Sequence, residues 1–228
     1  MSDEAELVVA IDGPSGSGKS TIARGVAGAL GLEVLDTGAM YRAVTWLALQ
    51  QGADLGEADQ LADLAAHAHL TVTTDPSAPA IVANGTDVTV AVRTPAVTAA
   101  VSEVSAVPGV RAAMVARQRE IIGAGGIVVE GRDIGSTVAP DAAVKVFLTA
   151  DAATRAQRRA RQDGIAELPV ALESTEADLR RRDTADSTRV ASPLQQAPDA
   201  LVLDSSGLEI DRVVAIIVER AQATAVTR

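Results

Sequence analysis

Residues 13–20 read Gly-Pro-Ser-Gly-Ser-Gly-Lys-Ser, and they lie between an apolar run at 7–11, Leu-Val-Val-Ala-Ile, and a segment of helical periodicity at 21–30. The apolar run is short, continuous and ended by a turn, which is typical of a strand buried on both faces. Gly31 follows the helical segment, where a helix stop is expected. The sequence therefore predicts a buried strand, a glycine-rich turn and a helix in direct succession.

The same alternation of short apolar runs and helical segments recurs along the chain. Further strands are predicted at 33–35, 126–129, 143–148 and 200–203, and helices at about 95–104, 108–122, 151–163 and 208–221. Short buried strands that alternate with helices are typical of a parallel sheet with helices on both faces. The predicted fold class is therefore α/β, with a five-stranded parallel sheet.

One stretch, at about 69–92, interrupts this alternation. Three short β-like runs follow one another there, at 70–73, 80–83 and 86–90, and Asn84-Gly85 separates the last two. Asn-Gly between alternating runs is the strongest short-range signal for a β-hairpin. We therefore expect a small antiparallel β insert in the α/β core.

Length and composition restrict the class of protein. The chain has 228 residues, of which 47% are hydrophobic, so it can bury a full core as one large domain or as one domain with an inserted lobe. The net charge of −10 argues against a nucleic acid partner bound through a general basic surface. The chain has no cysteine, which excludes disulfides, a thiol catalyst and cysteine-ligated zinc.

Nothing in the sequence predicts export or membrane insertion. No stretch of about twenty residues is free of charge, so we expect no membrane-spanning helix and no membrane partner. The acidic start, Met1 to Glu6, lacks the basic and then apolar layout of a signal peptide. We therefore expect a cytoplasmic protein.

The pattern at 13–20 matches the phosphate-binding loop, G-x-x-x-x-G-K-[ST], and it lies where that motif requires, between a strand and a helix N-terminus. Glycines let backbone N–H groups surround phosphate oxygens, and the helix start adds positive potential at the same point. Lys19 is then expected to bridge the β- and γ-phosphates of a nucleoside triphosphate, and the Ser20 hydroxyl to face Mg²⁺.

Switch proteins, motors and kinases share this loop, and the rest of the sequence narrows the choice. Asn84 is the only asparagine, so the Asn-Lys-x-Asp element of GTPases is absent, as are the protein-kinase signatures His-Arg-Asp and Asp-Phe-Gly. Arg42 follows the second predicted strand, and Arg132 and Asp133 follow the third, where open α/β sheets bind ligands. Planar guanidinium groups suit phosphate oxygens, so the pattern favours a small-molecule kinase.

Four motifs together resemble the bacterial cytidylate kinases. They are residues 13–21, Asp36-Thr37-Gly38-Ala39-Met40-Tyr41-Arg42, Glu130-Gly131-Arg132-Asp133-Ile134-Gly135, and Arg181-Arg182-Asp183-x-x-Asp186-Ser187-x-Arg189 followed by Ser192-Pro193-Leu194. The resemblance covers about residues 8–218. It implies transfer of the γ-phosphate of ATP to CMP or dCMP, with Mg²⁺, to give ADP and CDP or dCDP.

The resemblance also implies a P-loop kinase fold in one domain, 1–228. The core is expected at about 1–38 and 108–228, the CMP-binding lobe with the β insert at about 39–107, and a short lid at about 153–168. Arg155, Arg158, Arg159 and Arg161 fall in this lid, where they either close over ATP or form a solvated helix face. The protein is expected to act as a monomer.

Site residues follow from the same resemblance. The resemblance assigns catalysis to Lys19, Arg132 and Arg158. It assigns ATP binding to Gly13, Pro14, Ser15, Gly16, Ser17, Gly18, Lys19, Ser20 and Thr21. The cytosine ring is assigned to Ser102, Arg111 and Asp133, the ribose hydroxyls to Arg182 and Asp186, and the acceptor phosphate to Arg42, Arg132 and Arg189. Thr37, at a position often held by Ser, is assigned to the acceptor substrate as well. The amino group of cytosine suits the Asp133 carboxylate, and its O2 and N3 acceptors suit Arg and Ser donors.

Several alternatives stay open at this point. The acceptor is UMP, AMP or shikimate in other P-loop small-molecule kinases, and a nucleotide-dependent switch or binding module has no acceptor. Ser20 and Thr21 are both candidates for the hydroxyl that meets the metal. Asp36 and Asp204 are either outer groups of the metal site or ordinary turn caps. His67 and His69 are expected to be surface or packing residues, because their spacing suits no metal pair.

Overall fold

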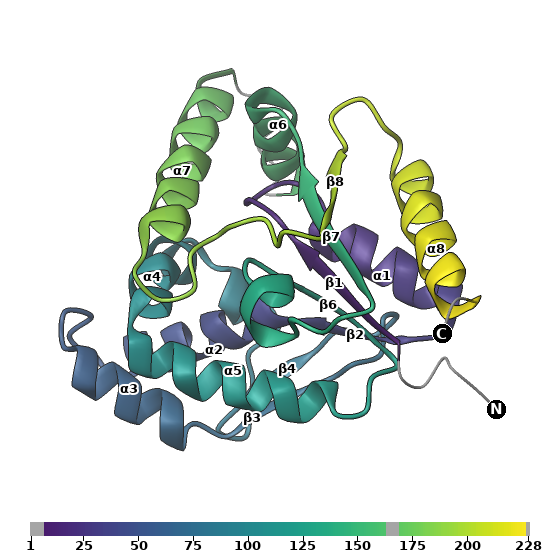
Figure 1. The fold of residues 1–228 in the computed structure, drawn as a ribbon. Helices are drawn as coiled ribbons and strands as arrows, with labels where there is room; N and C mark the ends of the chain where they lie inside the picture. Colours follow the sequence, from purple (N-terminus) through teal and green to yellow (C-terminus); the bar gives the residue numbers. More distant parts are fainter. Residues whose placement is uncertain (1–6, 163–168, 227–228) are drawn as a thin grey trace.

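The computed structural model describes residues 7–162 and 169–226. Its core is a sheet of five parallel strands in the order β2-β6-β1-β7-β8 (Figure 1). The strands are β1 (Val8–Asp12), β2 (Glu33–Asp36), β6 (Ile127–Gly131), β7 (Val144–Thr149) and β8 (Leu201–Asp204). All five correspond to predicted apolar runs, so the predicted fold class is confirmed.

Both faces of this sheet are covered by helices. The main ones are α1 (Lys19–Leu30), α2 (Thr37–Gln50), α5 (Pro108–Ile122) and α8 (Ile210–Val226). Val9 and Ile11 of β1 belong to one hydrophobic cluster, with α1 and α8, whereas Ala10 belongs to a second cluster, with α2 and α5. Because side chains alternate along a strand and both faces are buried, β1 is apolar from Val8 to Ile11.

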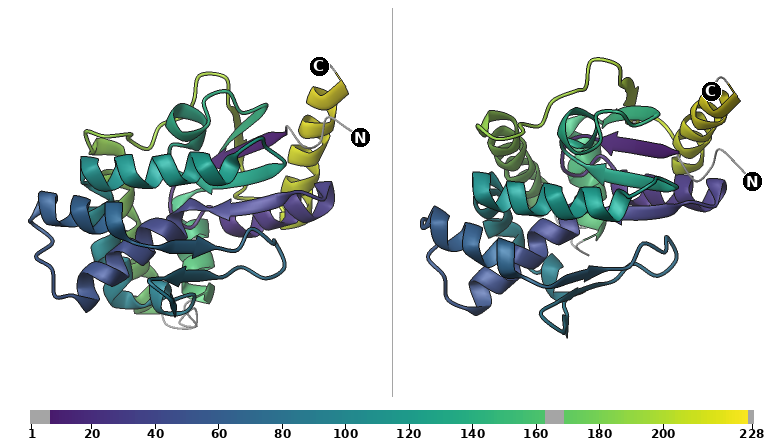
Figure 2. Two further views of the ribbon diagram at one scale, coloured as in Figure 1. Left: turned by 90° about the horizontal axis from the view of Figure 1, so that it is seen from below. Right: turned by 60° about the horizontal axis from the view of Figure 1, so that its bottom comes forward.

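The residues between β2 and β6 form the lobe in which the sequence predicts an insert. Besides α2 and the start of α5, the lobe region holds α3 (Ala58–His67), β3 (Leu70–Val72), β4 (Ile81–Ala83), β5 (Thr86–Asp87), the 3₁₀ turn η2 (Ala91–Arg93) and α4 (Pro95–Ala106). The three strands form a small antiparallel sheet (Figure 2). Asn84 and Gly85 make its hairpin turn with φ of 47° and 80°, the left-handed conformation that such turns require. The last strand ends at Asp87, earlier than the predicted run.

The lobe and the main sheet share one hydrophobic cluster. Leu35 and Val129 of the sheet belong to it, together with Leu61 of α3, Val104 of α4 and Met114 of α5, all of them buried. Packing of this kind fixes the lobe against the sheet.

Two further helices, α6 (Ala152–Gln162) and α7 (Pro169–Thr188), pack against each other and stand over the ends of β1 and β7 (Figure 1). The first matches a predicted helix, but α7, like α2 and α3, has no counterpart among the predicted segments. The predicted lid at 153–168 coincides with α6 as far as Gln162, and its residues 163–168 lie outside the described part of the chain.

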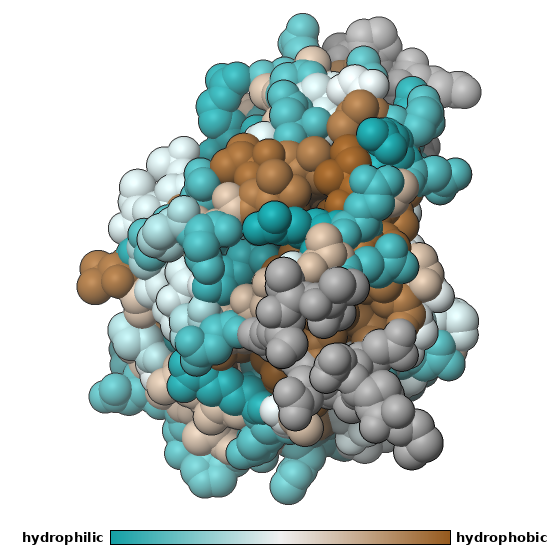
Figure 3. All heavy atoms as spheres, turned by 45° about the vertical axis from the view of Figure 1, so that its right-hand side comes forward, coloured by the Kyte–Doolittle hydropathy of each residue, from teal (hydrophilic) through white to brown (hydrophobic). Residues whose placement is uncertain are grey.

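Part of the molecular surface is apolar. Figure 3 shows apolar surface on the side of the molecule that carries β8 and α8, where Val202 and Ile210 are about half exposed. Among the described residues, no single helix is long and apolar enough to cross a membrane. The one helix pair that passes the length and composition test jointly, α4 with α5, is bent by 95°.

Candidate active site

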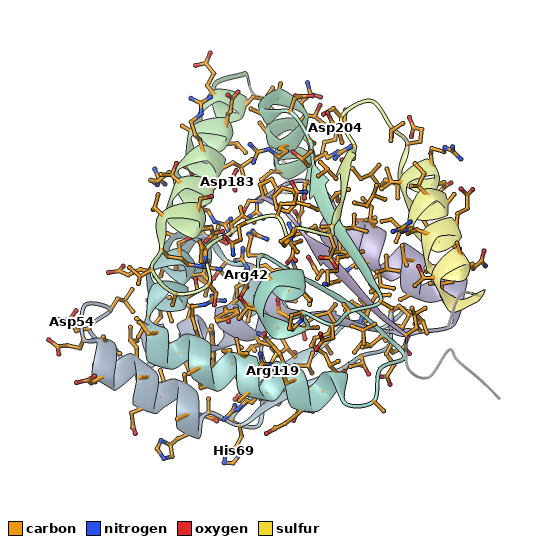
Figure 4. The ribbon with its side chains drawn as sticks, viewed as in Figure 1. Arg42, Asp54, His69, Arg119, Asp183 and Asp204 are labelled. Carbon is orange, nitrogen blue, oxygen red and sulfur yellow. The ribbon has the colours of Figure 1, made fainter. Side chains whose placement is uncertain are left out.

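The candidate site is a cleft of about 1010 Å³ at the carboxyl ends of the strands. It runs from the loop after β1 to the far side of α4 and is roofed by α6 and α7. Nearly all residues that the resemblance assigns to substrates line it: Ser15, Gly16, Gly18, Lys19, Ser20, Thr21, Thr37, Arg42, Ser102, Arg111, Arg132, Asp133, Arg158, Arg182, Asp186 and Arg189. Gly13, Pro14 and Ser17 belong to the same loop but do not line the cleft. Figure 4 shows Arg42 in the interior, between the lobe and the helices above it.

The loop after β1 depends on its glycines. Gly13 has φ of 149°, and a Cβ atom there would lie 2.0 Å from the carbonyl oxygen of Leu148. Gly18, the N-cap of α1, has φ of 92°, which favours glycine because it has no Cβ. The chain can therefore turn tightly from β1 into α1 and present backbone N–H groups at the start of the helix.

Lys19 is buried under this loop. Its Nζ donates to the carbonyl oxygen of Pro14 at 2.7 Å. Burial lowers the pKa of the Lys19 ammonium to about 7, and the nearby Arg132 guanidinium lowers it further, while the carboxylates of Glu130 and Asp12 oppose both effects. A phosphate bound beside Lys19 would supply the negative charge that stabilises its ammonium form.

Glu130, at the end of β6, meets the start of α1. The Ser20 hydroxyl donates to the Glu130 carboxylate, and the Thr37 hydroxyl donates to the Glu130 backbone carbonyl at 2.7 Å. Burial raises the pKa of the Glu130 carboxyl to about 7, and the nearby Asp36 carboxylate raises it further. This end of the cleft thus carries a hydroxyl and two carboxylates beside the Lys19 ammonium.

Several guanidinium groups converge on the middle of the cleft. Burial lowers the pKa of Arg42 to about 9 and that of Arg182 to about 10, and in each case another arginine adds to the effect, Arg182 beside Arg42 and Arg132 beside Arg182. Positive charges held together in a half-buried cleft repel one another, and an anion bound between them offsets this repulsion. The cluster is therefore built for anionic ligands.

Beyond this cluster lies a buried ion pair. Arg111 Nη2 and Asp133 Oδ2 are 2.5 Å apart, and each side chain is about 5% exposed or less. Arg189 Nη2 lies 3.6 Å from the other carboxylate oxygen of Asp133. The Arg111 guanidinium also lies over the Tyr41 ring, 5.1 Å from its centre. A carboxylate and two guanidinium groups at a cleft wall can accept and donate hydrogen bonds to one planar polar ring.

A family model for cytidylate kinases matches residues 9–223 of this chain. The chain belongs to the cytidylate kinase family. Cytidylate kinases from Mycobacterium avium strain 104 and Streptomyces griseus are 49% and 48% identical to it over 211 and 216 residues. These alignments cover 92% and 94% of this chain, and 92% of each relative.

Other relatives are longer proteins. A bifunctional pantoate ligase/cytidylate kinase from Synechococcus sp. strain JA-3-3Ab is 54% identical over 204 residues, which are 88% of this chain and 38% of that protein. The chain therefore spans less than two fifths of that relative. A crystal structure of an uncharacterized protein from Eubacterium ventriosum aligns with a TM-score of 0.52 over 95% of this chain and 99% of its own, at 12% identity, and shows a similar fold only.

In this member of the cytidylate kinase family, α6 and α7 are joined to the glycine-rich loop through Ser15. Arg132 donates from Nη2 to the Ser15 hydroxyl at 2.7 Å and from Nε to Asp186 of α7 at 2.9 Å. The Ser15 N–H donates to Asp183 at 3.0 Å, and Asp183 also pairs with Arg155 of α6. Figure 4 shows Asp183 on the side of α7 turned toward α6. No role for Asp183 or Glu130 was predicted, although each lies within a quoted motif.

The four α6 arginines do not act alike. Arg158, Arg159 and Arg161 line the cleft, and Arg158 donates to the carbonyl oxygens of Ser17, at 3.1 Å, and Ser205, at 2.7 Å. Arg155 does not line the cleft, because it faces Asp183 and the Ser15 carbonyl instead. Helical spacing alone does not separate these two environments.

The remaining polar candidates, two aspartates and two histidines, differ in whether they line the cleft. Asp36 lines the cleft and also caps α2 by accepting the Ala39 N–H at 2.9 Å. Asp204 does not line the cleft, and its carboxylate caps a turn by accepting the N–H and hydroxyl of Ser206. His67 and His69 are exposed on the lobe, and Figure 4 shows His69 at its outer edge. Turn capping therefore accounts for Asp204.

Proposed function

We propose that this protein transfers the γ-phosphate of ATP to CMP or dCMP. One observation carries the proposal most directly: a single cleft joins the glycine-rich loop and Lys19 at one end to the Arg111 and Asp133 pair at the other, with the guanidinium cluster between them. Two nucleotides bound end to end would bring the donor and acceptor phosphates into that cluster. Membership of the cytidylate kinase family supports the choice of acceptor.

ATP is proposed to bind with its phosphates in the loop at 13–21. Backbone N–H groups of the loop and the N-terminus of α1 hold the phosphates, and Lys19 neutralises them. Arg158, which contacts the loop at Ser17, adds charge from above. These groups are in place before the reaction, so charge that develops on the transferred group meets fixed positive partners.

The acceptor base is proposed to lie against Ser102, Arg111 and Asp133. The carboxylate accepts from the amino group of cytosine, and the guanidinium and hydroxyl groups donate to its ring acceptors. Uracil presents a carbonyl where cytosine has the amino group, so the carboxylate repels it. A buried polar pair that loses its partner is costly, which gives such a site its selectivity.

The acceptor phosphate and ribose are proposed to bind the middle of the cleft. Arg42, Arg132 and Arg189 hold the phosphate, and Arg182 and Asp186 hold the ribose hydroxyls. Thr37 is proposed to contact the acceptor as well. Transfer then proceeds directly between the nucleotides, by positioning and charge stabilisation without a covalent enzyme intermediate.

The residues beside Lys19 fit Mg²⁺, which prefers oxygen ligands. Ser20 and Glu130 contact each other at the cleft wall, and Asp36 lies near Glu130. Within 7–162 and 169–226, no three His, Cys, Asp or Glu side chains form a metal site of their own. We therefore propose that the ATP phosphates and water hold Mg²⁺, with Ser20 facing it. Bound there, the ion neutralises phosphate charge.

We also propose the finer organisation that the family suggests. The core at 1–38 and 108–228 would carry ATP, the lobe at 39–107 would receive CMP, and residues 153–168 would close as a lid. Every group named above comes from one chain, so a monomer suffices. With a net charge of −10, the proposed partners are small nucleotides rather than nucleic acid or membrane, in the cytoplasm where ATP and CMP are available.

An acceptor panel tests the proposal. With ATP and Mg²⁺, ADP release should require CMP or dCMP, and UMP, AMP and shikimate should give at most a few per cent of that rate. Uracil and shikimate lack the amino donor, and adenine, which has one, is a larger two-ring base without the carbonyl acceptor O2 of cytosine. A coupled assay for ADP measures this. Release with AMP or shikimate alone would assign the cleft to another kinase, and ADP release that ignores every acceptor would indicate a switch or binding module.

Binding of ATP should be accompanied by proton uptake. At pH 8, Lys19 is mostly neutral in the free protein, since burial holds its pKa near 7. Nearby phosphates raise that pKa again, so the complex gains up to about one proton per ATP. Calorimetry in buffers of different ionisation enthalpy measures the uptake. It should nearly vanish in Lys19→Met, and equal uptake in the two proteins would assign the proton to another group.

A further inference from the structure

Asp12, the last residue of β1, is a buried carboxylate to which nothing above gives a role. It is 4% exposed, and it lies directly before Gly13 at the start of the glycine-rich loop. Its two oxygens accept two backbone hydrogen bonds, from the N–H of Ile134 to Oδ1 and from the N–H of Gly135 to Oδ2, each at 2.8 Å.

These two N–H groups begin a one-turn π-helix, η3 (Ile134–Val138). The first N–H groups of a helix have no partner within it, and a side chain at the N-cap usually accepts one of them. Asp133 occupies that N-cap position, but its side chain caps nothing. Its carboxylate instead faces Arg111 at 2.5 Å and Arg189 at 3.6 Å.

We propose that Asp12 is a positioning residue: it caps the turn in place of Asp133, and so leaves the Asp133 carboxylate for the acceptor base. This inference rests on the proposed function, in which Asp133 reads cytosine. An aspartate that follows a strand and precedes a turn would otherwise satisfy the nearest free N–H groups with its own side chain. Asp12 removes that competition, because both N–H groups are already occupied.

The geometry around the turn allows little adjustment. A Cβ atom on Gly131, the residue paired with Asp12 in the sheet, would lie 2.6 Å from Ile134 Cδ1 and 2.7 Å from the Thr37 hydroxyl oxygen, so the segment is tightly packed. Since Asp12 adjoins Gly13, the same carboxylate also ties the acceptor side of the cleft to the loop proposed to hold ATP.

The charge state of Asp12 is compatible with this role. Burial raises the pKa of its carboxyl to about 6, with a smaller upward effect from Asp133, and the two backbone N–H groups and Lys19 act in the opposite direction. At pH 7.5 the carboxyl is therefore ionised, and both oxygens can accept.

The test is Asp12→Asn. The amide has nearly the same size but only one acceptor oxygen, so it leaves one of the two N–H groups without a partner. We expect KM for CMP to rise, and the preference for CMP over UMP to fall, each on the order of tenfold. KM for ATP should change less than KM for CMP, because the loop contacts to the phosphates remain, although Asp12 adjoins the loop and acts on Lys19. Hydrogen exchange measured by mass spectrometry should be faster at 134–135 in Asp12→Asn than in the wild type.

Asp12→Ala, which loses both acceptors, should show larger changes in the same direction.

Val9→Ala is the matched control. Val9 lies on the same strand, is fully buried and belongs to a different hydrophobic cluster from Ile134. We therefore expect Val9→Ala to lower thermal stability without changing the CMP to UMP ratio. If Asp12→Asn keeps the wild-type ratio while Asp133→Asn alters it, the positioning role is rejected and the proposed function stands. The role is also rejected if Asp12→Asn and Val9→Ala change the two KM values alike. A wild-type protein that does not use CMP would instead overturn the proposed function itself.

Discussion

Lys19→Met should lower kcat for phosphoryl transfer by about 10³-fold, the scale expected when one charged partner of a transition-state oxyanion is removed. The ammonium is the group closest to the loop carbonyl of Pro14, and among the described residues it is the one lysine that lines the cleft. Arg42, Arg132 and Arg189 are proposed to hold the acceptor phosphate, so we do not expect them to replace Lys19 at the loop. Initial rates at saturating CMP and ATP measure the effect.

The same substitution should leave the fold intact. Burial disfavours the Lys19 ammonium, as its lowered pKa indicates, and methionine is an apolar side chain of similar length. We therefore expect a melting temperature no lower than that of the wild type. Lys145→Met is the matched control, since Lys145 is the only other lysine and pairs with Asp199 outside the cleft. Near-normal turnover in Lys19→Met would exclude this lysine from the chemistry.

Asp133→Asn should reverse much of the preference for CMP. The asparagine amide can donate to the carbonyl that uracil carries in place of the amino group, so we expect the kcat/KM ratio of CMP to UMP to fall about 10²-fold or more. Measuring both acceptors with one preparation of the variant gives this ratio, which does not depend on the fraction of folded protein.

The variant carries a cost in stability that must be measured separately. Arg111 is 3% exposed and loses its carboxylate partner, and breaking a buried pair costs about 3–5 kcal/mol. Thermal unfolding measures this loss of stability. Binding of CMP to the wild type and to the variant measures the effect on the site. An unchanged CMP to UMP ratio, whatever the stability, would remove Asp133 from base recognition.

Local sequence patterns were sufficient to predict the central sheet and the glycine-rich loop. Each strand of the sheet contains a short apolar run, which in the central strands β1 and β6 is buried on both faces, and the glycines at 13, 16 and 18 all have positive φ. Such features depend on residues a few positions apart, and so they are visible without knowledge of the fold.

Of the three helices without a predicted counterpart, α2 and α7 lack such a local signal. Helix α2 begins with Thr37 and Gly38, which are poor helix formers, and starts there because Asp36 caps it. Helix α7 is rich in charge and has few apolar residues to bury, with Leu179 at 3% exposure as its main core contact. Pairing of Asp183 and Asp186 with Arg155 and Arg132 helps to hold it in place, and these partners are distant in sequence.

By itself, the sequence determined the α/β class and the position of the glycine-rich loop, and its resemblance to a family pointed to residues most of which line the cleft. Only the tertiary structure decided which carboxylate faces which donor: Asp12 accepts from a turn 122 residues away, Asp133 pairs with Arg111, and Asp183 with Arg155. The reason is physical. Periodicity reflects neighbours along the chain, whereas the pairing of a buried charge depends on which groups folding brings together out of water.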